Sequence, residues 1–179
     1  MAPAPVVLIL GAGPRVGASV AQSLASRGYH VAIASRKGLN AKNEAGYFSL
    51  RADFTKPETI PIIFAAVKAE FGVSPSVIVY NAASLTPPSD KESVLSISSN
   101  KILSDLNVNT ISPFVAAQEA VRAWETLPSE DKKTFIYTGN VQNAQIVPVP
   151  MMLDLGMGKA ASAYWIGVAD TAYEFKGYR

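Results

Sequence analysis

Short apolar runs alternate along this chain with longer segments whose apolar residues recur every three or four positions. The short runs predict buried strands at residues 6–10, 31–34, 47–50, 76–80 and 134–138. The longer segments predict amphipathic helices, because that spacing places apolar side chains on one helix face. Strands that alternate with helices are typical of a parallel sheet covered by helices on both faces.

The predicted helices are bounded by residues that cap or break helices. Gly28 is placed to end the first helix, Pro57 to open the second, and Pro113 to kink or break the third. The helices themselves are expected at residues 16–28, 57–71, 103–126 and 159–175, with loops at 84–100 and 139–154.

Residues 1–179 are expected to form one α/β domain with a Rossmann-type, doubly wound parallel sheet. A length of 179 residues is enough for a single sizeable core. Hydrophobic residues make up 49% of the chain and charged residues 17%, which is an ordinary globular composition rather than a disordered one.

Charge and composition exclude several classes of function. A formal net charge of +2 is too small to indicate a nucleic acid or a membrane surface as partner. The chain has no cysteine, and its one histidine, His30, is expected at the surface ahead of a strand. No apolar run approaches the roughly eighteen residues of a membrane span. We therefore expect a soluble, cytoplasmic protein without a metal site.

The first strand runs into a glycine-rich turn that leads directly into the first helix. Gly11, Gly13 and Gly17 occupy this turn. The N–H groups at a helix start are unpaired and carry partial positive charge, and glycines let an anion approach the backbone closely. We therefore expect a cradle for the phosphates of a nucleotide. The alternative is a plain tight turn of an α/β protein.

The end of the second strand indicates which nucleotide is bound. NAD-binding folds usually place a carboxylate there for the ribose 2′-hydroxyl, whereas basic groups suit a 2′-phosphate. This chain has Ser35, Arg36 and Lys37 there and no acid, and Arg15 in the glycine turn can reach the same phosphate. NADP(H) is favoured over NAD, and a methyltransferase is disfavoured. Arg36 and Lys37 also fit a second interpretation, as parts of a solvated loop.

The ordered set of motifs resembles the short-chain dehydrogenase/reductase family over nearly the whole chain. Asp53 follows the third strand, Asn81-Ala82-Ala83 closes the fourth, and Asn109 lies on the long helix, where the family holds a water of its proton relay. The resemblance implies an oxidoreductase that acts on a carbonyl or an alcohol. The expected cofactor-binding residues are Gly11, Gly13, Arg15, Val16, Gly17, Ser35, Arg36, Lys37, Asp53, Phe54, Asn81, Ala82, Ala83 and Lys159.

The resemblance fails at the residue that donates the proton in the family. A tyrosine is expected four residues before Lys159, but Leu155 stands there and has no proton to give. The position of the family's catalytic serine falls on Gly139 or, with a shift of one residue, on Thr138. The catalytic candidates are therefore Asn109, Thr138 and Lys159. Thr138 also fits a polar strand end, and Asn109 a residue that only caps or kinks its helix.

Three tyrosines are candidates for the missing proton donor. Tyr80 and Tyr137 lie on predicted strands, and Tyr164 lies on the apolar stripe of the last helix. Alternation in a strand points side chains into a sheet face, and an apolar helix stripe faces a core. We therefore expect all three to be core or half-buried packing residues.

Two functions of different kinds stay open. The first is an NADP-dependent oxidoreductase of altered mechanism, in which a bound water, Thr138 or the substrate supplies the proton. The second is a non-catalytic NADP(H)-binding protein, acting as a sensor, scaffold or partner subunit, which Leu155 favours.

The resemblance also bears on assembly and length. It implies a homo-oligomer, a dimer or a tetramer, formed through the long helix and the last helix. Members of the family usually have two further strands. We therefore expect either a part of a longer chain or a shortened variant, with the fifth strand at an open sheet edge.

Overall fold

The computed structural model describes residues 4–179, which form a six-stranded sheet in the order β3-β4-β2-β1-β5-β6. All neighbouring strands are parallel except β3, which pairs antiparallel with β4. The chain crosses from one half of the sheet to the other between β4 and β5, so β1 lies at the switch point. The strands are β1 (Val6–Leu10), β2 (His30–Ser35), β3 (Ala41–Lys42), β4 (Phe48–Arg51), β5 (Val77–Tyr80) and β6 (Thr134–Tyr137).

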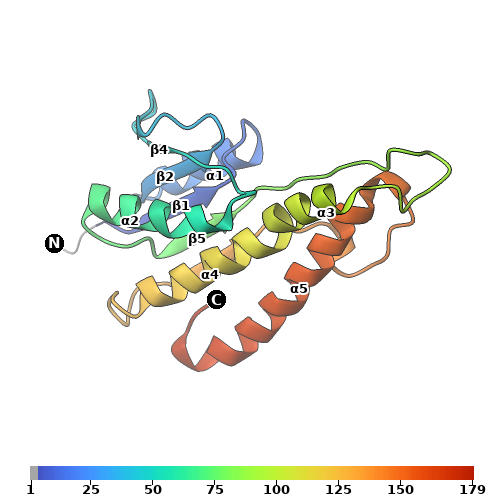
Figure 1. Cartoon of the computed structure of the whole chain (residues 1–179). Coiled ribbons are helices and arrows are strands. Elements are labelled where there is room, and N and C mark those ends of the chain that lie inside the picture. The colour runs from blue at the N-terminus through green and yellow to red at the C-terminus, as the bar shows by residue number, and fades with distance from the viewer. Residues whose placement is uncertain (1–3) are drawn as a thin grey trace.

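Five α-helices lie within residues 4–179 and cover the sheet (Figure 1). They are α1 (Val16–Ala25), α2 (Ile60–Phe71), α3 (Ser99–Leu106), α4 (Ser112–Trp124) and α5 (Leu153–Tyr173). A π-helical segment, η2 (Asn107–Ile111), joins α3 to α4 without a loop. The parallel sheet with crossover helices confirms the expected doubly wound α/β class.

The core lies on both faces of β1, whose five side chains are all fully buried. Val7 and Ile9 point to the face covered by α1, where Ala21 packs against them. Leu8 and Leu10 point to the opposite face, which α2 and α4 cover. A strand buried on both faces reads as a continuous apolar run, which explains why β1 is the clearest strand signal in the sequence.

Some predicted boundaries were wrong. The helix expected at 103–126 begins earlier and is divided by η2, and Pro113 lies in the first turn of α4, which agrees with the predicted break rather than with a kink. The last helix begins at Leu153 instead of 159, so the loop expected at 139–154 ends at residue 152. His30 is the first residue of β2 rather than part of a turn, although it is exposed as expected.

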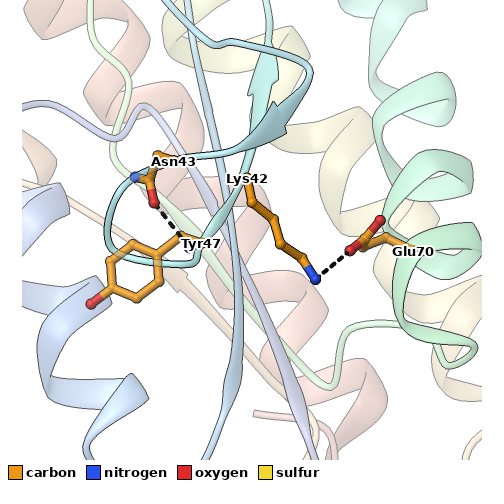
Figure 2. A network of polar contacts seen from close by, with 4 residues as sticks. All are labelled: Lys42, Asn43, Tyr47 and Glu70. Atoms are coloured by element: carbon orange, nitrogen blue, oxygen red, sulfur yellow. Dashed lines mark hydrogen bonds and ion pairs between the residues drawn. The ribbon is translucent and has the colours of Figure 1, made fainter.

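The short edge strand β3 was not predicted. Lys42 in β3 forms an ion pair with Glu70 of α2, with 3.2 Å between Nζ and Oε1 (Figure 2). The turn after β3 is closed by the Tyr47 amide, which donates to Asn43 Oδ1 at 2.9 Å. A two-residue strand with polar surroundings has no alternating apolar pattern, and a short edge of this kind resists pairing with other chains.

The opposite edge is partly covered, which differs from the open edge expected for the fifth predicted strand. The Arg179 amide donates to the Lys133 carbonyl at 3.0 Å, and the Phe135 amide donates to the Arg179 carbonyl at 2.6 Å. Lys133 and Tyr178 form a parallel bridge. The last residues of the chain therefore run beside β6 in the direction of a further parallel strand.

Candidate cofactor and active site

The glycine turn requires glycine at two of its three positions for reasons of packing. Gly11 has a φ of +93°, and a Cβ there would overlap the backbone of Ala82. A Cβ at Gly17 would lie 2.6 Å from the Cα of Ala12. Gly13 differs, because no atom of residues 4–179 lies within 4 Å of its Cβ position. The turn therefore leaves open space beside Gly13, at the start of α1.

The start of α1 carries no side-chain cap. Arg15 occupies the N-cap position with exposed surroundings, and Val16 begins the helix half exposed. The first N–H groups of a helix have no partner within the helix and attract an anion. The open space, the uncapped helix start and the arginine together fit a phosphate group.

The basic residues at the end of β2 lie beside the same sheet edge. Ser35 is the last residue of β2, and Arg36 and Lys37 follow it in an exposed turn. A Cβ at Gly38 would overlap the backbone of Leu50, so this turn is held close to β4. The turn thus presents one hydroxyl and two cations and no carboxylate.

Asp53, after β4, lies near this basic turn. Hydrogen bonds from the Thr55 hydroxyl (2.8 Å) and amide (3.1 Å), together with the neighbouring cations Lys56 and Arg36, hold the pKa of Asp53 below its usual value. The carboxylate is exposed and is available to a ligand. Phe54 is buried, and its ring packs edge-on against Tyr80, so its side chain belongs to the core.

The residues after β5 pack against the glycine turn and border the candidate phosphate site. The Asn81 amide donates to the Leu10 carbonyl at 2.7 Å, and its side chain donates to the Gly11 carbonyl at 2.9 Å. Ala82 lies directly against Gly11, and Ala83 is exposed. The structure therefore brings the ends of β1, β2, β4 and β5 together at one edge, where ligands bind in open parallel sheets.

Asn109 lies fully buried within η2, where the π-helical geometry frees backbone carbonyls from the usual helical bonds. Its side chain binds the backbone of Ser84 twice, accepting from the Ser84 amide at 3.0 Å and donating to the Ser84 carbonyl at 2.7 Å. The Asn109 carbonyl accepts from the hydroxyls of Tyr137 (2.9 Å) and Ser162 (2.8 Å). Both lone pairs of that carbonyl are therefore in use.

Lys159 of α5 is 4% exposed, and its amine lies at the end of β6. The Nζ atom donates to the Thr138 carbonyl at 2.7 Å and lies 4.4 Å from the centre of the Tyr137 ring. No ion pair involving Lys159 forms among residues 4–179. Burial lowers the pKa of Lys159 to about 8. The site thus holds an amine that changes its charge near neutral pH.

A glycine next to this lysine explains the close approach of α5 to η2. A Cβ at Gly158 would overlap the Cβ of Asn109, and the Thr110 hydroxyl donates to the Gly158 carbonyl at 3.2 Å. Asn109, Thr138 and Lys159, the three predicted catalytic candidates, therefore lie together where α5, η2 and the end of β6 meet.

Comparisons with known proteins agree with this geometry. A family model described as short chain dehydrogenase matches residues 5–144. The chain is 36% identical to the short chain dehydrogenase/reductase dmxR12 of Cryptosporiopsis sp. (strain 8999), over 98% of this chain and 74% of that protein. The chain belongs to the short-chain dehydrogenase/reductase family. Membership in this family means a fold that binds a nicotinamide cofactor.

Solved structures of the family show the same fold at lower identity. A 3-oxoacyl-[acyl-carrier protein] reductase from Brucella melitensis has a TM-score of 0.82 at 20% identity and matches 98% of this chain and 72% of its own. An oxidoreductase of the family from Brucella ovis, in complex with a partially ordered NAD, has a TM-score of 0.79 at 17% identity, covering 98% and 80%.

Within this family, the chain is a divergent member at the proton-donor position. Leu155 lies one turn before Lys159 on α5, the helical position that the sequence comparison assigned to the family's tyrosine. The hydroxyls of two nearby tyrosines already form hydrogen bonds with backbone carbonyls. The hydroxyls of Tyr80 and Tyr137 donate to the carbonyls of Val108 (2.6 Å) and Asn109 (2.9 Å), and burial raises the pKa of both. Their predicted packing role is confirmed.

The prediction for Tyr164 was wrong. Tyr164 is 78% exposed and Val168, one turn further along α5, is 56% exposed, as is 82% of Phe175 in the turn after the helix. The helix instead buries a face of small and polar residues, Gly158, Lys159 and Ser162. The apolar stripe therefore faces away from the protein core.

Sequence reasoning missed two aspartates and a serine near the site. Asp105 of α3 and Asp154 of α5 are both buried, and Ser84 lies between them and Asn109. Neither aspartate belongs to a motif or a periodic pattern. The one available signal was the position of Asp154, immediately before Leu155.

Residues 4–179 contain neither a membrane-spanning helix nor a cluster of metal ligands. No helix there is long and apolar enough to span a membrane. Histidine, aspartate and glutamate side chains of this part of the chain do not gather in groups of three that would hold a metal ion.

Proposed function

We propose that the protein binds NADP(H) and reduces a carbonyl compound, or oxidises the corresponding alcohol, with Lys159 in place of the family's tyrosine as the proton donor. The preference for NADP(H) rests on the basic turn Ser35-Arg36-Lys37, because it offers charge to a 2′-phosphate and no carboxylate to a free ribose hydroxyl. The residues at the strand ends fit the cofactor, since open space and an uncapped helix start coincide at Gly13.

Substituting Arg36 with alanine is expected to weaken NADPH binding by about tenfold or more, the usual effect of losing a charged hydrogen bond. Binding of NADH should change by less than about twofold, since it lacks the phosphate. Fluorescence titrations with both cofactors measure this. Arg27→Ala, in the exposed turn after α1, is the matched control. Equal weakening of both cofactors by Arg36→Ala would contradict the 2′-phosphate assignment.

The proposal for the reaction rests on one observation, the buried Lys159 amine without an acidic partner. When bound, a reduced nicotinamide would supply the hydride to the carbonyl carbon. The carbonyl oxygen keeps the electron pair of its π bond and takes a proton from the Lys159 ammonium group. A pKa of about 8 suits this transfer, because a donor works best near the operating pH. The neutral amine then regains a proton from water.

Proton donation by Lys159 predicts a defined pH dependence of the reduction rate. The protonated amine is the donor, so the rate of NADPH oxidation by a reactive diketone should fall as pH rises through about 8. Lys159→Arg keeps the positive charge but cannot give up its proton, so the rate should drop about a hundredfold and the dependence near pH 8 should vanish. A pH profile unchanged in the arginine variant excludes Lys159 as donor.

A second function, cofactor binding without catalysis, is favoured by a different observation. Leu155 offers no proton, and the Asn109 carbonyl already accepts two hydroxyls, so it has no lone pair left for a relay water. A sensor, scaffold or partner subunit needs the cradle but not the relay. Tight NADPH binding with no oxidation across a panel of carbonyl compounds would select this function over the first.

We further propose that the protein self-associates as a dimer or tetramer through α4 and α5. The two helices run beside each other in Figure 1 and line a hollow of about 560 Å³. Exposed apolar side chains surround it, including Phe114 on α4 with Tyr164 and Val168 on α5. An exposed apolar surface of this kind is typical of a protein interface.

The proposals of a small-molecule substrate and of a cytoplasmic location rest on the family resemblance and on the composition.

A further inference from the structure

Two aspartates from different helices meet in the protein interior next to the candidate site. Asp105, on α3, is 3% exposed, and Asp154, in the first turn of α5, is fully buried. The two carboxyl groups are close enough to act on each other, because Asp105 adds to the effect of burial in raising the pKa of Asp154, whereas Asp154 helps to lower the pKa of Asp105. A hydrogen bond between two carboxyl groups requires a proton on one of them, since an ionised carboxylate only accepts.

The remaining bonds of the pair all go to the loop after β5 or to the start of α5. Asp154 Oδ2 accepts from the Thr86 amide at 2.7 Å, and its Oδ1 accepts from the Leu155 amide at 2.7 Å. Asp105 Oδ1 accepts from the Ser84 hydroxyl. Asp105 Oδ2 is buried and has no hydrogen-bond partner within residues 4–179. A proton shared with the Asp154 carboxyl group would supply that partner, so that all four carboxyl oxygens are hydrogen-bonded.

The charges around the pair do not neutralise a second negative charge. Lys101, on the same helix as Asp105, is the cation that acts on it. The loop contributes the neutral Ser84 and Thr86, and Asn109 of η2 binds the Ser84 backbone. Lys159 of α5 donates to the Thr138 carbonyl instead. Two buried carboxylates repel each other, and no cation within residues 4–179 lowers the pKa of Asp154, so the second ionisation is costly.

We propose that Asp105 and Asp154 are a proton-sharing pair that positions the loop 84–86 and, through it, the cofactor-binding end of β5. The link is short, because Ser84 follows Asn81 and Ala82, the residues that close the cradle against Gly11. The pair thus acts through the loop rather than on the substrate. Its effect on the cofactor rests on the proposed binding of NADP(H), whereas its effect on the loop does not.

Loss of the shared proton should release the loop. Burial, and then the neighbouring Asp105, raise the pKa of Asp154. A carboxyl group with a raised folded-state pKa stabilises the structure below its unfolded value, and the stabilisation disappears as pH rises through the folded-state value. The docked loop is therefore favoured by acid and weakened by base, the reverse of an ordinary carboxylate that is bound to a cation.

Amide hydrogen exchange tests the pair without any cofactor. The Thr86 and Leu155 amides, which donate to Asp154, are compared with the Asn81 amide, which donates to the Leu10 carbonyl. The protection factors of Thr86 and Leu155, relative to Asn81, should fall about tenfold between about pH 5 and about pH 9. A ratio that stays constant over this range in the unmodified protein overturns the proposal.

Two isosteric variants separate proton sharing from plain structure. In Asp105→Asn, the new amide donates to Asp154 without a titrating proton, and its oxygen still accepts from Ser84, so protection should stay high at every pH. In Asp154→Asn, the amide replaces an oxygen that accepts a backbone N–H, so Thr86 or Leu155 should lose protection at every pH. An Asp105→Asn protein with the pH dependence of the unmodified protein also overturns the proposal.

Titration of the same proteins with NADPH tests the step to the cofactor. The dissociation constant of the unmodified protein should rise about fivefold over this pH range, and that of Asp105→Asn should not. If the exchange ratios change as expected but the dissociation constant does not follow them, positioning of the cofactor end of β5 is overturned. If NADPH fails to bind in every variant while the exchange ratios still change, the proposed function fails and the positioning of the loop stands.

Discussion

Gly13→Asp is expected to abolish NADPH binding while the protein keeps its fold. In the part of the chain that the structure describes, no atom lies within 4 Å of the Cβ position at Gly13, so the added side chain enters open space beside the start of α1. If that space holds the cofactor's phosphates, the new carboxylate repels them and replaces the favourable field of the helix start. The dissociation constant should rise about a hundredfold or more, with an unchanged thermal midpoint.

Gly13→Asn is the matched control for this prediction. Asparagine has nearly the same size and shape as aspartate but no charge, so it isolates the electrostatic effect from the steric one. We expect Gly13→Asn to bind NADPH much more tightly than Gly13→Asp, as measured by fluorescence titration. If both variants bind as the unmodified protein does, the phosphates lie elsewhere, and the glycine turn is a plain tight turn.

Gly11→Ala is expected to cause the largest loss of stability. The residue has a φ of +93°, which an alanine adopts at a cost of about 1–2 kcal/mol. Its Cβ would also overlap the backbone of Ala82, which cannot move aside as a flexible side chain can. The added Cβ would therefore push the residues after β1 away from the residues after β5. Chemical denaturation should show a loss of about 3 kcal/mol or more in the free energy of unfolding.

Gly28→Ala separates the two causes of this loss. Gly28 has a similar φ of +85°, but its Cβ position has no neighbour within 4 Å among the described residues. Its variant should therefore lose only the backbone part, about 1 kcal/mol. If the two variants lose the same amount, close packing against Ala82 does not explain Gly11.

The parallel sheet could be predicted because its physical signals are local. A strand buried on both faces needs an unbroken apolar run, and β1 has one. The π-helical segment η2 could not be predicted in the same way, since nothing in its residues departs from a helical pattern. Its stability comes from distant partners, such as the Tyr80 and Tyr137 hydroxyls that bind its freed carbonyls.

The orientation of α5 shows where a periodic pattern misleads. Tyr164 and Val168 recur at helical spacing, yet they are exposed. The buried face of α5 carries Gly158, Lys159 and Ser162, because it packs against η2 and the site rather than against an apolar surface. An apolar stripe predicts that a helix face is covered, but it does not say whether the same chain covers it.

Only the parts of the candidate site that belong to sequence motifs could be predicted. The glycine turn and the basic residues after β2 follow from their places at strand ends, where a parallel sheet brings them together. The Asp105–Asp154 pair could not be found, because its members are 49 positions apart in the sequence numbering and meet only when α3 and α5 pack. The same packing buries Lys159 and lowers its pKa, which no sequence pattern indicates.

Both proposed functions depend on the binding of NADP(H) at the ends of β1, β2 and β5. Equilibrium titration of the unmodified protein with NADPH and with NADH tests it most directly. We predict saturable binding of NADPH and at least about tenfold weaker binding of NADH, because only NADPH carries the phosphate that Arg36 and Ser35 would bind. Absence of NADPH binding, or NADH binding of equal or greater affinity, would contradict it.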